Sequence, residues 1–167
     1  LLALVLAARW RRPWPIVGGI ALATLVNHAA AGALGAWLTS LVDAHTLRWV
    51  LGASFLAMAV WMLIPDRLDH PPDRALPLGV FGTTVVLFFL VEMGDKTQIA
   101  TAALAARYTP LAAVVAGTTL GMLIANVPVV VLGERAARRL PVRAVHRVAA
   151  AVFAVLGIGV LLGVGRG

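Results

Sequence analysis

Long apolar runs separated by short polar or proline-containing stretches dominate the chain. A membrane-spanning helix needs about 20 mostly apolar residues, and several runs approach that length. They are residues 14–38, 48–64, 78–106, 110–132 and 145–164, and residues 1–8 resemble the end of a further span. None of these runs alternates apolar and polar residues as a half-buried strand does. The pattern therefore predicts an all-α fold, a polytopic membrane helix bundle.

A polar stretch over residues 65–77 divides this pattern into two halves. It is the only linker-like part of the chain and contains Asp66, Asp69 and Asp73. We predict a first repeat over residues 1–64, a charged central loop over residues 65–77 and a second repeat over residues 78–167.

The two halves share residues at a constant offset of 98 positions. Leu-Ala-Ala-Arg-Trp at residues 6–10 matches Leu-Ala-Ala-Arg-Tyr at residues 104–108. The same offset pairs Gly19 with Gly117, Gly35 with Gly133 and Phe55 with Phe153. We expect each copy to contain three spans. Because three is an odd number, the two copies should have opposite orientations in the membrane, as in the inverted repeats of many transporters. The first helix of the first repeat is missing, and we expect it upstream of Leu1.

Composition and charge support a membrane protein and exclude several other classes. Hydrophobic residues make up 61% of the chain and charged residues 13%, against about 45–50% and 25% in soluble domains. With no cysteine, disulfides and thiolate metal sites are excluded. The net charge of +7 comes mainly from arginines between the apolar runs. If the loops alternate between the two sides of the membrane, ten arginines fall on the side of the first loop and three on the other. This bias predicts that the side of the first loop is cytoplasmic. It also accounts for the positive charge, so we expect no nucleic-acid partner.

Charged residues interrupt the apolar run over residues 78–106. A charged side chain at the centre of a membrane helix costs about 2.5–3.5 kcal/mol, so Glu92, Asp95 and Lys96 must pair, face a wet cavity or bind an ion. We predict one continuous helix over this run, in which their i, i+3 and i+4 spacing places all three on one face, and Gly94 weakens the helix there. A Glu92–Lys96 pair that only locks two helices together is the alternative.

The donor atoms of this segment favour a hard cation. Glu92 and Asp95 offer carboxylates, while Thr97 and Gln98 add a hydroxyl and an amide oxygen. Oxygen donors without His or Cys suit Ca²⁺, Mg²⁺ or Mn²⁺. The sequence therefore predicts an oxygen-lined cation site in the second half of the chain.

The segment Glu92-Met93-Gly94-Asp95-Lys96-Thr97 resembles the E-x-G-D-K-[TS] signature of the GDT-type cation transporters. These membrane proteins are related to Golgi and chloroplast manganese and calcium transporters and to bacterial manganese exporters, within the LysE superfamily. The family has one motif in each half. Only the second is present here, and the first would end immediately before Leu1.

The resemblance implies exchange of Mn²⁺ or Ca²⁺ for protons at a carboxylate-lined site between the repeats. Protonation of a carboxylate would release the metal. The ion is then substrate, so no resident cofactor is expected, and the partners are the lipid bilayer, the cation and protons. The implied metal-ligand positions are Glu92, Asp95, Thr97 and Gln98, with Lys96 and Gly94 beside them.

Two asparagines lie at matched depth in the two halves. Asn27 and Asn126 correspond with a one-residue slip at the same offset. Either they line the ion pathway, or each bonds a backbone carbonyl of a neighbouring helix. His28, beside Asn27, could join a proton route or be a packing residue.

Other functions fit the same pattern. The chain could be a non-transporting scaffold, or a half-site subunit that needs a partner's motif, and it could form a homo-oligomer. A LysE-like exporter of small molecules is a further alternative. Since no hydrolase or metalloprotease motif is present, we expect no enzyme. The arginine- and alanine-rich composition favours a multi-pass protein of a bacterial plasma membrane.

Overall fold

Seven helices and no strand make up the parts of the chain that the structure, a computed structural model, describes: residues 2–64, 76–133 and 142–164. The helices are α1 (Leu2–Trp10), α2 (Pro13–Leu38), α3 (Ala44–Met62), α4 (Gly79–Glu92), α5 (Lys96–Arg107), α6 (Leu111–Leu132) and α8 (Val142–Leu161). Three apolar segments are long enough to cross a membrane: Pro13–Leu38, Leu111–Leu132 and Arg143–Leu161. The prediction of an all-α membrane helix bundle is confirmed. Most of the predicted central loop, residues 65–75, lies outside the described residues.

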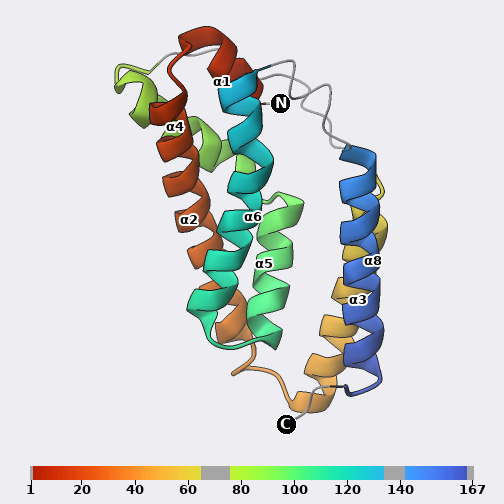
Figure 1. Ribbon diagram of the computed structural model, residues 1–167. Coiled ribbons are helices and arrows are strands. Elements are labelled where there is room, and N and C mark those ends of the chain that lie inside the picture. The colour runs from red at the N-terminus through yellow and green to blue at the C-terminus, as the bar shows by residue number, and fades with distance from the viewer. Residues whose placement is uncertain (1, 65–75, 134–141, 165–167) are drawn as a thin grey trace.

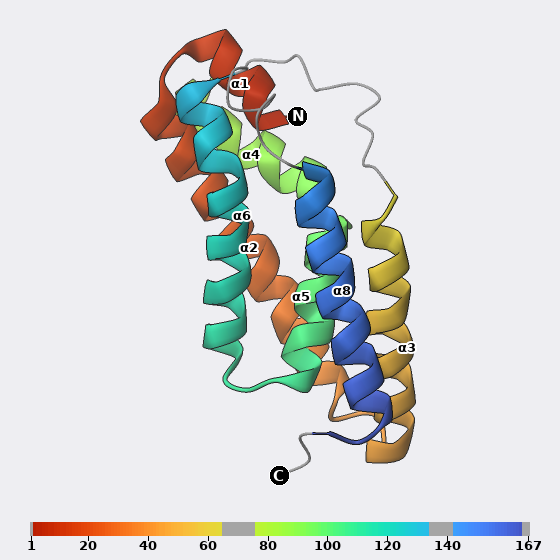
Figure 2. The same cartoon turned by 45° about the vertical axis from the view of Figure 1, so that its right-hand side comes forward.

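The helices form a bundle and a pair beside it. Helix α2 runs through the bundle and packs against α4, α5 and α6, while α3 and α8 pack mainly against each other (Figures 1 and 2). Helix α5 contacts both α2 and α3. It therefore joins the α3–α8 pair to the rest of the molecule.

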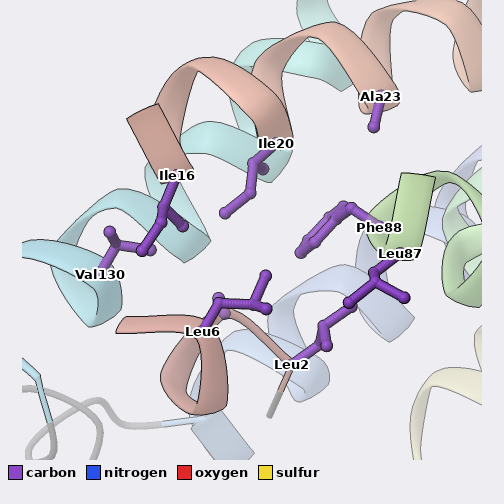
Figure 3. Packing of buried hydrophobic residues seen from close by; sticks show 9 residues of the cluster. Leu2, Leu6, Ile16, Ile20, Ala23, Leu87, Phe88 and Val130 are labelled. Carbon is purple, nitrogen blue, oxygen red and sulfur yellow. The ribbon is translucent and has the colours of Figure 1, made fainter. Parts of the chain in front are cut away.

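Two hydrophobic clusters correspond to this division. In the bundle, Leu6 of α1, Ile16 and Ile20 of α2, Phe88 of α4 and Val130 of α6 point toward one another (Figure 3). The second cluster joins α3, α5 and α8, and its members include Phe55, Ala100 and Phe153. Burial of these side chains, at about 1.5–3 kcal/mol for each large one, holds each group of helices together.

The helix ends agree with the predicted alternation of loops. The starts of α2 and α8 and the end of α6 lie at one end of the molecule, and the α2–α3 and α5–α6 turns lie at the other (Figure 1). Five described arginines flank the first end: Arg9, Arg11, Arg12, Arg143 and Arg147. Arg48 and Arg107 lie near the second end. That the first end faces the cytoplasm stays a prediction.

Helix boundaries also follow the offset of 98 residues. Helices α2 and α6 begin at Pro13 and Leu111, and α3 and α8 begin at Ala44 and Val142. Phe55 stacks on its counterpart Phe153, with ring centroids 6.1 Å apart. This spacing supports the internal repeat, while the inverted relation of its copies remains a prediction.

Close packing of α2 on α5 leads to a stability prediction. A Cβ atom added at Gly35 would overlap the carbonyl oxygen of Ala102, whereas one at Gly117 meets no atom within 4 Å. Gly35→Ala should therefore force the two backbones apart and cost about 1–3 kcal/mol. Thermal unfolding in detergent would show a clear fall in Tm, and Gly117→Ala is the matched control with no expected fall. Equal Tm values for both variants would contradict the packing described here.

Candidate cation site

The predicted span over residues 78–106 is broken in its middle. Helix α4 ends at Glu92 and α5 begins at Lys96, and the break lies about halfway between the two ends of the molecule (Figure 1). The prediction of one continuous helix is therefore wrong. Glu92 ends one helix and Lys96 begins the next, so Glu92, Asp95 and Lys96 do not share one helix face.

Gly94 and Asp95 explain the break. Gly94 has φ of +84°, a left-handed conformation that costs other residues about 1–2 kcal/mol. Asp95 then caps α5, because its Oδ2 accepts hydrogen bonds from the Thr97 amide at 3.2 Å and the Thr97 hydroxyl at 2.8 Å. An Asp at this position satisfies amides that have no partner within the helix. The local sequence thus favours two half-helices over one.

Several oxygen atoms gather around the break. Gln98 Oε1 accepts a hydrogen bond from the Gly94 amide at 2.6 Å, which draws that side chain back over the turn. Asp95 is half-buried, and its second oxygen, Oδ1, accepts no hydrogen bond from the described residues. Glu92, also half-buried, ends α4 at the other side of the break. The structure thus brings Asp95, Thr97 and Gln98 together in one turn.

Lys96 donates a hydrogen bond to a group outside the motif. Its Nζ donates to the main-chain carbonyl of Ile64 at 2.7 Å, just beyond the end of α3. The side chain is only 5% exposed. Sequence reasoning placed Lys96 with the carboxylates and missed this contact, because no sequence pattern links residues 64 and 96.

Helix α2 supplies polar groups beside the break. Asn27 and His28 are each 2% exposed. Asn27 Nδ2 donates to the carbonyl of Phe89 in the last turn of α4 at 3.1 Å, so it bonds a neighbouring helix. His28 Nδ1 lies 2.9 Å from the Thr118 hydroxyl of α6. Through these contacts α2 connects the break to α6.

The two asparagines are not equivalent. Asn126 is half-buried, and its Nδ2 donates to the carbonyl of Met122 within α6 at 3.0 Å. It contacts neither α4 nor α5 through a hydrogen bond. The structure therefore brings Asn27 to the break and leaves Asn126 bonded to its own helix.

This difference predicts unequal effects of replacing the two asparagines. Asn27→Leu would leave the half-buried carbonyl of Phe89 without this donor, a loss of about 1–3 kcal/mol. Asn126→Leu removes only a bond within one helix and serves as the control. Thermal unfolding of the two variants should show the larger fall in Tm for Asn27→Leu, and a larger fall for Asn126→Leu would contradict the assignment.

The described part of the site does not form a complete metal cage. Among residues 2–64, 76–133 and 142–164, no three His, Asp or Glu side chains converge on one point. A pocket of about 280 Å³ lies between α2 and α5 and reaches Gln98. Its other lining residues are Ala30, Ala31, Leu34, Ile99 and Ala102. The half-helix ends thus form an open group of oxygen donors next to a small apolar pocket.

Comparisons with known proteins agree with these features. The family described as "Divalent cation/proton antiporter GDT1" matches residues 1–70 and 80–166. A protein of Vibrio cholerae serotype O1 named "Putative manganese exporter" is 46% identical over 159 residues, which cover 95% of this chain and 79% of the relative. No solved structure matches the chain.

Proposed function

The chain belongs to the GDT1 family of divalent cation/proton antiporters, and from this membership we propose that it exchanges Mn²⁺ for protons across a bacterial plasma membrane. Divalent cation transport is the activity of the family, which is not a class of enzymes. The relative from Vibrio cholerae bears the name of a manganese exporter, and this favours Mn²⁺ over Ca²⁺ as the main substrate.

The break between α4 and α5 is the observation that carries the proposal. Discontinuous helices near the middle of a membrane are typical of transporters, because unwound backbone and half-helix ends can bind ions there. Asp95 lies in the break, and Glu92, the other acidic residue of the motif, ends α4 beside it. Charged side chains at this depth cost free energy unless they bind an ion or pair with each other.

The ligands we propose are the carboxylates of Glu92 and Asp95, with the oxygens of Thr97 and Gln98 completing part of the shell. Mn²⁺ accepts such oxygen donors. When ionised, the two carboxylates together carry a charge of −2, opposite to that of one divalent ion, and Lys96 reduces the net charge of the motif to −1. Asp95 already presents Oδ1 without a hydrogen bond from the described residues.

Proton coupling follows from competition for the same carboxylates. A carboxylate that takes a proton loses its negative charge and becomes a donor, so it releases a bound cation. Metal binding on one side and protonation on the other would then exchange the two. The pocket beside Gln98 is our candidate for one end of the ion route.

The proposed selectivity can be measured in proteoliposomes with a pH gradient. Mn²⁺ should enter with opposite movement of protons, and excess Ca²⁺ should inhibit the Mn²⁺ flux only weakly, while Mg²⁺ should not inhibit it. Strong inhibition by Ca²⁺ together with faster Ca²⁺ flux would assign calcium as the substrate. Mn²⁺ flux without proton movement would contradict the exchange.

A further inference from the structure

Lys96 lies at the junction between the motif and the end of α3. Its buried Nζ donates to the carbonyl of Ile64 at 2.7 Å and lies 5.7 Å from the ring centroid of Trp61. Trp61 belongs to the last turn of α3, and Ile64 follows that helix by two residues. A buried ammonium is costly unless it is hydrogen-bonded. These two contacts therefore fix the direction of the side chain.

The end of α3 is a favourable place for a cation. The last carbonyls of a helix lack partners within it and carry the negative end of its dipole. The amides of Leu63 and Ile64 bond back to Val60 and Trp61, so the chain stays tightly wound up to the carbonyl that Lys96 reaches. The Trp61 ring adds a cation–π contact. Lys96 thus caps α3 from the first residue of α5.

The pair that α3 forms with α8 is connected to the bundle mainly through α5, the helix that begins with Lys96. Within the pair, a Cβ atom at Gly52 or Gly157 would collide with Leu161 or Leu56 respectively, so the two helices pack closely and should move as one unit. The first residue of α5 is also the first residue after the break. A contact at this point couples the position of the pair to the geometry of the motif.

We propose that Lys96 is a positioning residue that ties the helix break to the C-terminal end of α3, so that the α3–α8 pair and the break move together during transport. This inference rests on the proposed cation exchange. It assigns Lys96 to the coupling between helices and not to the ligand shell of the ion.

The test is a double-mutant cycle on Lys96→Met and Trp61→Leu in reconstituted protein, with Lys96→Arg as the conservative variant. Lys96→Met should lower the Tm by at least about 2 °C. It should also lower the maximal Mn²⁺ flux at least about threefold, an effect typical of residues that couple two sites. The KM for Mn²⁺ should change by no more than about twofold. Lys96→Arg should restore most of the flux, because it keeps the donor and the cation–π contact.

Coupling distinguishes this role from a role at the ion. Trp61→Leu should lower Tm and flux in the same direction, and the double variant should be no worse than Lys96→Met, since contacting residues are not additive. Trp14→Leu, at a side chain that is 73% exposed, is the control for loss of a tryptophan. If Lys96→Met does not fold, the same cycle is read with Lys96→Gln, whose shorter, uncharged side chain also removes the ammonium from Trp61 and Ile64.

Two results would overturn the inference. The first is additive Tm changes in the cycle. The second is a rise of more than about fivefold in the KM of Lys96→Met with the maximal flux unchanged, which would place Lys96 at the ion. Failure of the unaltered protein to move Mn²⁺ would instead refute the proposed function. The Tm cycle does not depend on transport, so it would still test the contact between Lys96 and α3.

Discussion

Asp95→Asn should lower Mn²⁺ flux at least about 100-fold. The substitution removes the attraction between a carboxylate and a dication, and a loss of roughly 3 kcal/mol of this attraction accounts for a 100-fold effect. Asn is as good a helix cap as Asp. The amide oxygen can therefore still accept the Thr97 hydrogen bonds, and the protein should remain folded in the membrane. Initial rates of Mn²⁺ uptake, normalised to protein in the membrane, measure the effect.

Asp43→Asn is the matched control for this prediction. Asp43 caps α3 as Asp95 caps α5, and its Oδ1 accepts hydrogen bonds from the amides of His45 and Thr46, each at 3.0 Å. The hydrogen bonds from Thr46 lower the pKa of Asp43, so it is ionised at neutral pH and loses the same charge on substitution. It lies in the α2–α3 turn, far along the chain from the motif. Equal flux losses in the two variants would refute a specific role for Asp95.

Gly94→Ala should reduce Mn²⁺ flux by about tenfold or more. An alanine in the left-handed conformation costs about 1–2 kcal/mol, and a backbone that relaxes out of this conformation would displace Asp95. Gly94 has φ of +84°, and an added Cβ would meet no atom within 4 Å. The effect therefore comes from the backbone and not from a steric clash. Flux measured beside Gly117→Ala, a control with no expected loss, tests it, and unchanged flux in Gly94→Ala would show that the left-handed turn is dispensable.

Much of the helical pattern could be predicted from hydropathy. Helices α2 and α6 begin and end within two residues of the predicted runs 14–38 and 110–132. Helix α3 begins four residues before its predicted run, because Asp43 provides a cap and hydropathy does not register capping. Apolar length defines a span well, whereas helix ends depend on single hydrogen bonds.

The candidate site was predicted less well, for a physical reason. Residue types indicated candidate oxygen donors, but the spacing rule for a helix face holds only while the helix is continuous. A signal for the break was present: glycine followed by Asp95, with Gln98 three residues later, is close to a capping box. The cross-helix contacts of Asn27, His28 and Lys96 depend on how helices pack together, and periodicity within one helix does not encode that.

The most direct test of the central claim is proton-driven Mn²⁺ uptake into membrane vesicles, compared between the unaltered protein, Asp95→Asn and Asp43→Asn. An imposed pH gradient should drive uptake in the unaltered protein and in Asp43→Asn. A protonophore should stop this uptake, and Asp95→Asn should show none. Uptake that ignores the pH gradient, or that persists in Asp95→Asn, would contradict a carboxylate-based exchange at the helix break.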